Sequence, residues 1–125
     1  MTGRPRHPAA DGEQNAGVAL RAIAEPRRRA ILRLVAGDEL AAGQIAAAFD
    51  ITRTAVSQHV TALKNAGLLS ERREGTRRIY RVRAEGLAGL REFLDEMWTD
   101  ALEAARRIAE HDQGSAGDDQ AVSTG

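Results

Sequence analysis

Apolar side chains recur every three or four positions over most of residues 16–112, which is the period of helices that bury one face. Residues that punctuate helices agree with this pattern: Pro26 suits a first helical position, Thr52 is a good N-cap, and Gly67 follows the end of a helix. The chain is therefore expected to be mainly helical, with helices over residues 18–24, 26–37, 43–49, 52–66 and 85–110.

The two ends of the chain lack this period. Residues 1–15 and 113–125 are rich in small and charged side chains, which cannot bury an apolar face. The 125 residues suit a single domain of ordinary size. We therefore expect a disordered arm (1–15), one domain (16–112) and a disordered tail (113–125).

Two short segments, residues 68–73 and 77–82, interrupt the helical period on either side of a turn that contains Gly75. Short runs of this kind around a glycine indicate a β-hairpin. Because side chains alternate along a strand, the second segment has an inner and an outer face. The inward side chains are expected to be Tyr80 and Val82, and the outward ones Arg77 and Arg81.

The residues before this hairpin have the spacing of a helix-turn-helix unit. The small residue Ala46 stands where the second helix crosses the first, and Asp50 occupies the turn position where φ is positive. Apolar residues flank the turn, at Ile45, Phe49, Ile51 and Val56. The predicted fold is a winged helix-turn-helix, mainly α with a small β-hairpin wing.

The second helix of this unit has a polar outer face. Val56, Val60 and Leu63 are expected to face inward, which leaves the opposite face with basic and uncharged polar residues and no acid from residue 51 to 70. Arginine can bind guanine and glutamine can bind adenine in the major groove. The residues predicted to contact DNA are Thr52, Arg53, Thr54, Ser57, Gln58 and Thr61 of this helix and Arg73, Gly75, Arg77 and Arg78 of the wing.

The net charge of zero conceals a division along the chain. Residues 18–83 carry thirteen basic and six acidic side chains, whereas residues 84–125 carry three basic and ten acidic ones. The net charges of these parts are +7 and −7. A basic middle part suits nucleic acid, and an acidic last third would stay away from it.

Four stretches identify a family: EPR at 25–27, TAVSQHV at 54–60, AGL at 66–68 and RREG at 72–75. With them, residues 18–110 closely resemble the ArsR/SmtB family of winged-helix repressors. The resemblance implies a homodimer that packs through its first and last helices. It also implies that the partner is double-stranded DNA, bound at a palindromic operator.

The long last helix supports dimerisation independently of the resemblance. Its apolar residues are spaced alternately three and four apart from Leu87 to Ile108, a heptad pattern that one small domain cannot cover from one side. Phe93, Trp98 and Leu102 widen this apolar stripe. The residues predicted for the dimer interface are Val18, Leu20, Leu87, Leu90, Leu94, Met97, Trp98, Ala101 and Ile108.

The sequence argues against metal sensing and catalysis. The Cys-x-Cys ligands of metal-sensing relatives would fall within residues 40–46, which contain no ligand, and the chain has no cysteine. His111 stands beside Glu110 and Asp112 at a helix end, where neighbouring residues do not share a face. His59 is interpreted as a half-buried structural residue. No catalytic motif is found, so neither an enzyme nor a cofactor is expected.

Two alternatives stay open at this point: a repressor that responds to a metal or small molecule, and a winged helix used for protein–protein contact. The inducer, if one exists, is not predicted. No apolar run reaches the ~20 residues of a membrane span, and the first residues lack the apolar stretch of a signal peptide. We therefore expect a cytoplasmic protein that does not contact membranes.

Overall fold

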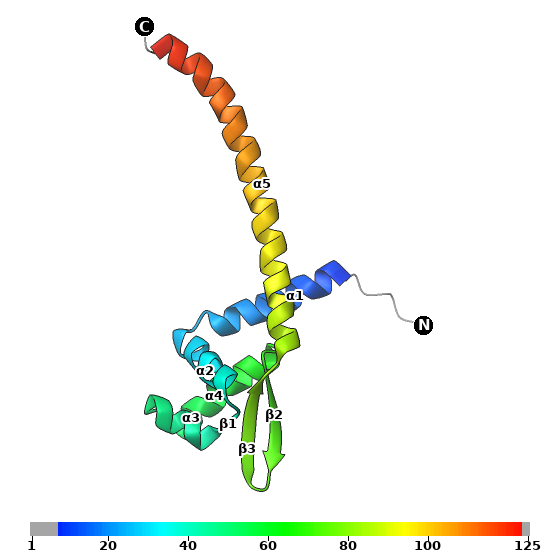
Figure 1. Cartoon of the computed structure of the whole chain (residues 1–125), viewed down its shortest axis with the longest axis vertical. Coiled ribbons are helices and arrows are strands. Elements are labelled where there is room, and N and C mark those ends of the chain that lie inside the picture. Colours follow the sequence, from blue (N-terminus) through cyan, green and yellow to red (C-terminus); the bar gives the residue numbers. More distant parts are fainter. Residues whose placement is uncertain (1–7, 124–125) are drawn as a thin grey trace, which may run out of the picture. The chain divides into compact units, whose positions relative to one another are not determined.

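A computed structural model of the protein describes residues 8–123, with side chains described for residues 12–113. The chain divides into two compact units, of which the first ends at Phe93 and the second begins at Leu94. Within the described range the elements are α1 (Pro8–Ile23), α2 (Pro26–Gly37), β1 (Leu40–Ala41), α3 (Ala42–Phe49), α4 (Arg53–Asn65), β2 (Leu69–Glu74), β3 (Arg77–Val82) and α5 (Ala84–Ser123) (Figure 1). Helix α5 contributes to both units.

Helices α3 and α4 form the predicted helix-turn-helix unit. Asp50 ends α3 in the left-handed conformation, with φ 53° and ψ 50°. Thr52 caps α4, because its Oγ1 accepts a hydrogen bond of 3.0 Å from the Ala55 amide. On the inner face of α4, Val56, Val60 and Leu63 are buried as expected. Together with Ile31 and Ile45 they form the centre of the core.

The wing is a three-stranded antiparallel sheet in the order β1-β3-β2, not the expected two-stranded hairpin. Strand β1 pairs Leu40 with Tyr80 and Ala41 with Ile79. A strand of two residues is too short to show a periodic pattern in the sequence. The strand conformation of β1 therefore comes from its pairing with β3 rather than from local sequence. Ile79 and Tyr80 point to opposite faces of β3 and are both buried. Helices α2 and α3 contact β3, and α4 contacts β2.

The first helix begins earlier than the sequence suggests. Helix α1 starts at Pro8, so the expectation of a disordered arm over residues 1–15 is corrected for residues 8–15, and residues 1–7 lie outside the described range. Proline suits the first turn of a helix, and no further proline occurs before Pro26. Ala16, Ala19 and Ala22 are buried, so the second half of α1 packs against the rest of the first unit. The first half of the helix extends from this packed half.

The tail expectation needs the same correction, because α5 continues through residues 113–123, and residues 124–125 lie outside the described range. Each residue added to an existing helix forms one further backbone hydrogen bond, and no proline interrupts this segment.

Helix α2 ends at Gly37. The next residue, the C-cap Asp38, has an extended backbone, so this helix ends without a residue in the left-handed conformation.

The start of α5 packs closely against the turn between α4 and β2. A Cβ atom added to Gly86 would lie 1.9 Å from the carbonyl oxygen of Gly67, so only glycine fits at this contact. Gly67 has a φ of 77°, which glycine adopts at little cost. Among the helices that the structure describes, none has the length and hydrophobicity needed to cross a membrane.

Candidate nucleic-acid interface

The outer face of α4 is exposed, as the periodicity predicts. The structure exposes every residue that the sequence assigns to this face, namely Arg53, Thr54, Ser57, Gln58 and Thr61. The Thr52 hydroxyl also lies at the exposed end of α4, where its oxygen already accepts the capping hydrogen bond. Its proton remains available to donate, so capping and a contact to DNA are compatible. The arrangement offers a polar helix surface without a carboxylate.

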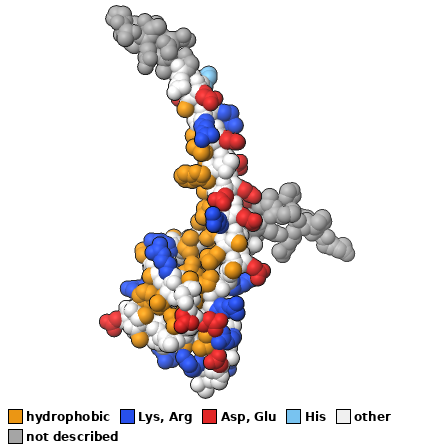
Figure 2. Space-filling model, in the orientation of Figure 1, with side chains coloured by type: hydrophobic (Ala, Val, Ile, Leu, Met, Phe, Trp, Pro, Cys, Tyr) orange, Lys and Arg blue, Asp and Glu red, His pale blue; other side chains and the backbone are white. Residues whose placement is uncertain are grey.

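The wing residues predicted to contact DNA are also exposed. These are Arg73, Gly75, Arg77 and Arg78. Gly75 has a φ of 65° and open space where a side chain would lie, so the tip allows a close backbone approach. In Figure 2, Lys and Arg side chains gather around the wing. The structure thus presents the predicted wing residues on its surface.

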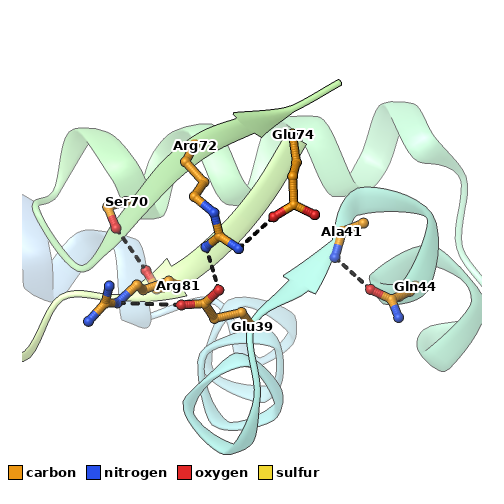
Figure 3. Close-up of polar contacts among 7 residues, drawn as sticks. All are labelled: Glu39, Ala41, Gln44, Ser70, Arg72, Glu74 and Arg81. Atoms are coloured by element: carbon orange, nitrogen blue, oxygen red, sulfur yellow. Dashed lines mark hydrogen bonds and ion pairs between the residues drawn. The ribbon is translucent and has the colours of Figure 1, made fainter. Parts of the chain in front are cut away.

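Two other wing arginines are held by carboxylates, which the sequence did not predict. Glu39, just before β1, binds Arg72 of β2 through Oε1, and its Oε2 lies 3.8 Å from Arg81 Nε of β3 (Figure 3). Arg72 also contacts Glu74, with 2.9 Å between Nη2 and Oε2. Arg81 is therefore exposed to solvent, as predicted, and its guanidinium also lies beside Glu39. Only the three-dimensional pairing of β1 with β3 brings Glu39 to these arginines.

A second charged cluster lies on the other face of the wing. Lys64 of α4 donates to Glu71 of β2 over 2.9 Å, and Arg78 Nε lies 4.0 Å from the same carboxylate. The hydrogen bond from Lys64 lowers the pKa of Glu71 below its ordinary value. Burial, and then the charge of Glu71, raise the pKa of Tyr80. The cluster links α4 to the sheet.

His59 is a half-buried residue at a helix contact, which agrees with its structural interpretation. Its Nδ1 accepts a hydrogen bond of 3.4 Å from Arg28 Nε of α2, and its Nε2 lies 3.8 Å from Glu25 Oε2. The other carboxylate oxygen of Glu25 accepts a hydrogen bond of 2.8 Å from the Arg27 amide and so caps α2. His59 therefore connects α4 to the first turn of α2.

The residues predicted for the dimer interface differ in their exposure, and Leu90 is the most buried of them. It is buried within the first unit, at 8% exposed, and thus belongs to that unit's core. Leu20, Leu87 and Leu94 are partly buried, and Ala101 is exposed. The large apolar side chains that remain exposed in the described range are Val18, Met97, Trp98, Leu102 and Ile108, and of these Leu102 was not predicted for the interface. Figure 2 shows hydrophobic side chains along one side of α5.

Comparison with known proteins decides the family. The model of a family described as "bacterial regulatory protein, arsR family" matches residues 25–71, from the N-cap of α2 into β2. The HTH-type transcriptional regulator Rv2034 of Mycobacterium tuberculosis is 43% identical over 101 residues, which cover 81% of this chain and 91% of that protein. The chain belongs to the ArsR family of bacterial regulators.

This ArsR-family protein also resembles a repressor and a solved structure. The transcriptional repressor SdpR of Bacillus subtilis is 42% identical over 55 residues, or 44% of this chain and 61% of that protein. The solution structure of the homodimeric winged helix-turn-helix DNA-binding domain (fragment 1–100) Mb0332 from Mycobacterium bovis is 36% identical, with a TM-score of 0.58. The match covers 80% of this chain and 92% of that one.

Family membership confirms two sequence predictions for this ArsR-family protein. The fold is a winged helix-turn-helix, and the protein is a DNA-binding regulator of transcription rather than an enzyme. In the part of the chain that the structure describes, no three His, Cys, Asp or Glu residues come together where they could hold a metal ion.

Proposed function

We propose that this ArsR-family protein represses transcription by binding a palindromic operator as a homodimer. The observation that carries the proposal is the exposed, acid-free outer face of α4, next to a wing whose tip carries exposed arginines. The positive end of α4 also favours a nearby phosphate. In this proposal Ser57, Gln58 and Thr61 enter the major groove, and the wing contacts the DNA backbone.

The homodimer part of the proposal is supported by the exposed apolar residues of α5. Trp98 is 69% exposed and Ile108 62% exposed, and both lie on or beside the heptad stripe. A second copy would remove this apolar surface from water. Val18 of α1 is a further exposed apolar residue that we propose for the dimer interface. The homodimeric state of the Mb0332 domain supports the same arrangement. A two-fold axis would place the recognition helices at half-sites roughly 34–36 Å apart.

Repression is supported by the similarity to SdpR, which is named a transcriptional repressor. A protein bound across a promoter blocks transcription without further contacts, so this role needs only the DNA-binding and dimerisation surfaces. A reporter gene behind the operator should be expressed less when the protein is present. An increase in expression would instead make the protein an activator.

The test of DNA recognition is a selection of genomic fragments by the purified protein, followed by gel-shift titrations of the selected operator at two salt concentrations. Gln58→Ala should weaken operator binding by about 1–3 kcal/mol and leave binding to an unrelated duplex unchanged. Gln14→Ala, an exposed glutamine of α1, serves as the matched control and should bind like the original protein. If no duplex is bound in a salt-dependent way at low micromolar protein, the protein–protein alternative replaces the proposal.

A further inference from the structure

A groove lies between the N-terminal end of α3 and the tip of the wing. Its volume is about 580 Å³, and residues of β1, α3, α4, the β2–β3 turn and the start of β3 line it. Three of these lining residues are arginines, Arg53, Arg77 and Arg78, and none is Asp or Glu. The groove is therefore a concave surface to which two separate elements contribute positive charge.

The guanidinium of Arg53 lies against α3, where Gly43 makes room for it. A Cβ atom at Gly43 would be only 2.6 Å from Arg53 Nη2 and 3.2 Å from Cζ. Arg53 is the first residue of α4, one turn before Ser57. Its side chain thus extends from the edge of the recognition surface into the groove, towards α3, rather than straight out from α4 as base reading would require.

Arg77 is held at the groove by Gln44. The Oε1 atom of Gln44 accepts a hydrogen bond of 2.8 Å from the Ala41 amide and another of 3.5 Å from Arg77 Nη2 (Figure 3 shows the first). Ala41 belongs to β1 and Arg77 to β3, so Gln44 joins the start of α3 to two paired strands of the wing. Gln44 is a positioning residue for the wing arginine.

The groove arginines differ from the other wing arginines in their charge balance. Arg72 is bound between Glu39 and Glu74, and Arg81 lies beside Glu39. Arg78 shares Glu71 with Lys64, and its Nε lies 4.0 Å from that carboxylate. Arg77 instead contacts the uncharged amide of Gln44, so its charge adds to the positive charge of the groove.

We infer that this groove seats a backbone phosphate of DNA, bound by Arg53, Arg77 and Arg78, and that Arg53 therefore fixes the position of the duplex instead of reading a guanine. The inference rests on the proposed DNA-binding function and deepens it. Guanidinium groups form forked, charge-assisted hydrogen bonds with phosphate oxygens. A phosphate here would lie one helical turn from Ser57, next to the bases that α4 contacts. Sequence discrimination then falls to Ser57, Gln58 and Thr61.

The decisive variants are Arg53→Ala and Arg53→Lys, titrated against the operator and an unrelated duplex over a range of salt. Arg53→Ala should weaken binding to both duplexes by a similar factor. Its salt slope should fall by about 0.9 for each phosphate that the protein no longer neutralises, or about 1.8 for a dimer that carries the change twice. Lysine keeps a point charge for the phosphate but cannot form the forked contact with guanine, so Arg53→Lys should bind within about threefold of the original protein.

A charge-neutral variant tests the geometry of the groove. Gly43→Ala adds a Cβ atom that displaces the Arg53 guanidinium, which is the end of a flexible side chain and can move without unfolding α3. Both duplexes should be bound about two- to fivefold more weakly, with unchanged net charge. Arg33→Ala, which removes an exposed charge from α2, is the control and should leave the salt slope unchanged. Circular dichroism and thermal melting verify that each variant is folded.

The outcomes separate the inference from the function on which it rests. If Arg53→Lys loses tenfold or more on the operator alone, Arg53 reads a base and the inference is wrong, while the DNA-binding function stands. Unchanged binding by Arg53→Ala, together with titratable binding of inorganic phosphate to the protein alone, would make the groove a free-anion site and also overturn the inference. If the original protein binds no duplex, both the function and the inference fail.

Discussion

Asp50 forms the turn between the two helices of the helix-turn-helix unit. It is the one non-glycine residue with positive φ in the described part of the chain, and it directs the backbone from α3 towards α4. The Ile51 amide completes the turn with a hydrogen bond of 3.1 Å to the Ala46 carbonyl. Aspartate tolerates this conformation better than most residues, because its short polar side chain can form local hydrogen bonds.

Two replacements of Asp50 should therefore distinguish the effect of the backbone conformation on stability from that of the aspartate side chain. Asp50→Ala should lower the free energy of unfolding by about 1 kcal/mol, because alanine adopts positive φ at greater cost. Asp50→Gly should stay within about 0.5 kcal/mol of the original protein, since easier turn formation is offset by a more flexible unfolded chain. Urea unfolding followed by circular dichroism measures both values. Equal destabilisation by the two variants would show that the aspartate side chain, not the backbone, matters.

Glu71 predicts a dependence of stability on pH. Its pKa is lowered in the folded protein, first by the hydrogen bond from Lys64, so the ionised form is favoured by folding. The resulting stabilisation is complete above the pKa of the unfolded chain and is lost as the pH falls through the lowered folded value. Glu71→Gln should cost about 0.5–1 kcal/mol at pH 7 and less at acidic pH. Unfolding at both pH values checks this, with the exposed Glu96→Gln as control.

At the scale of elements, the beginning of α5 is joined to the rest of its unit by a close backbone contact. The Arg83 amide donates to the Leu68 carbonyl over 2.9 Å, and Gly86 then passes next to Gly67. Arg83 Nη1 also donates to the Gly67 carbonyl over 3.4 Å. The wing and the last helix are therefore connected through the turn that follows α4.

A pair of glycine variants on α5 tests this contact. Gly86→Ala would place a Cβ atom 1.9 Å from a backbone oxygen, so the helix must shift, and we expect a loss of about 1–3 kcal/mol. Gly89→Ala lies less than one turn later, and no atom lies within 4 Å of the added Cβ. This second change should stabilise the helix by up to about 1 kcal/mol. Thermal unfolding compares the two variants, and a stabilising Gly86→Ala would disprove the close contact.

At the scale of the whole molecule, charge and hydrophobicity are divided between parts of the chain. The net charge of +7 over residues 18–83 coincides with the proposed DNA surface, whereas residues 84–125 carry −7. Figure 2 shows acidic side chains on the side of α5 opposite its hydrophobic ones. The division fits a molecule in which one part meets DNA and another meets a second copy, because the acidic part would repel phosphate.

The proposed dimer predicts different effects for two adjacent residues of α5. Trp98→Glu puts a charge into the apolar stripe, and the protein should sediment as a monomer at micromolar concentration and lose most of its operator affinity. Thr99→Glu introduces the same charge at an exposed neighbour outside the stripe and should remain dimeric. Sedimentation velocity and gel-shift titration measure both properties. Monomeric original protein would contradict the dimer directly.

The sequence by itself determined the elements whose signals are local. The bounds of α2, the N-cap at Thr52, the left-handed turn at Asp50 and the exposed face of α4 all follow from spacing and from the preferences of single residues. The family could be predicted for the same reason, because its motifs are contiguous stretches of the helix-turn-helix unit and wing.

The tertiary structure alone decided the features that depend on residues far apart in the chain. Strand β1 exists because β3 pairs with it, and that pairing brings Glu39 to Arg72, 33 residues later. The direction of the Arg53 side chain depends on the space that Gly43 leaves on a different helix. Sequence periodicity describes which face of an element is apolar, but it does not contain the distances between elements, and these distances decide which arginines meet a carboxylate.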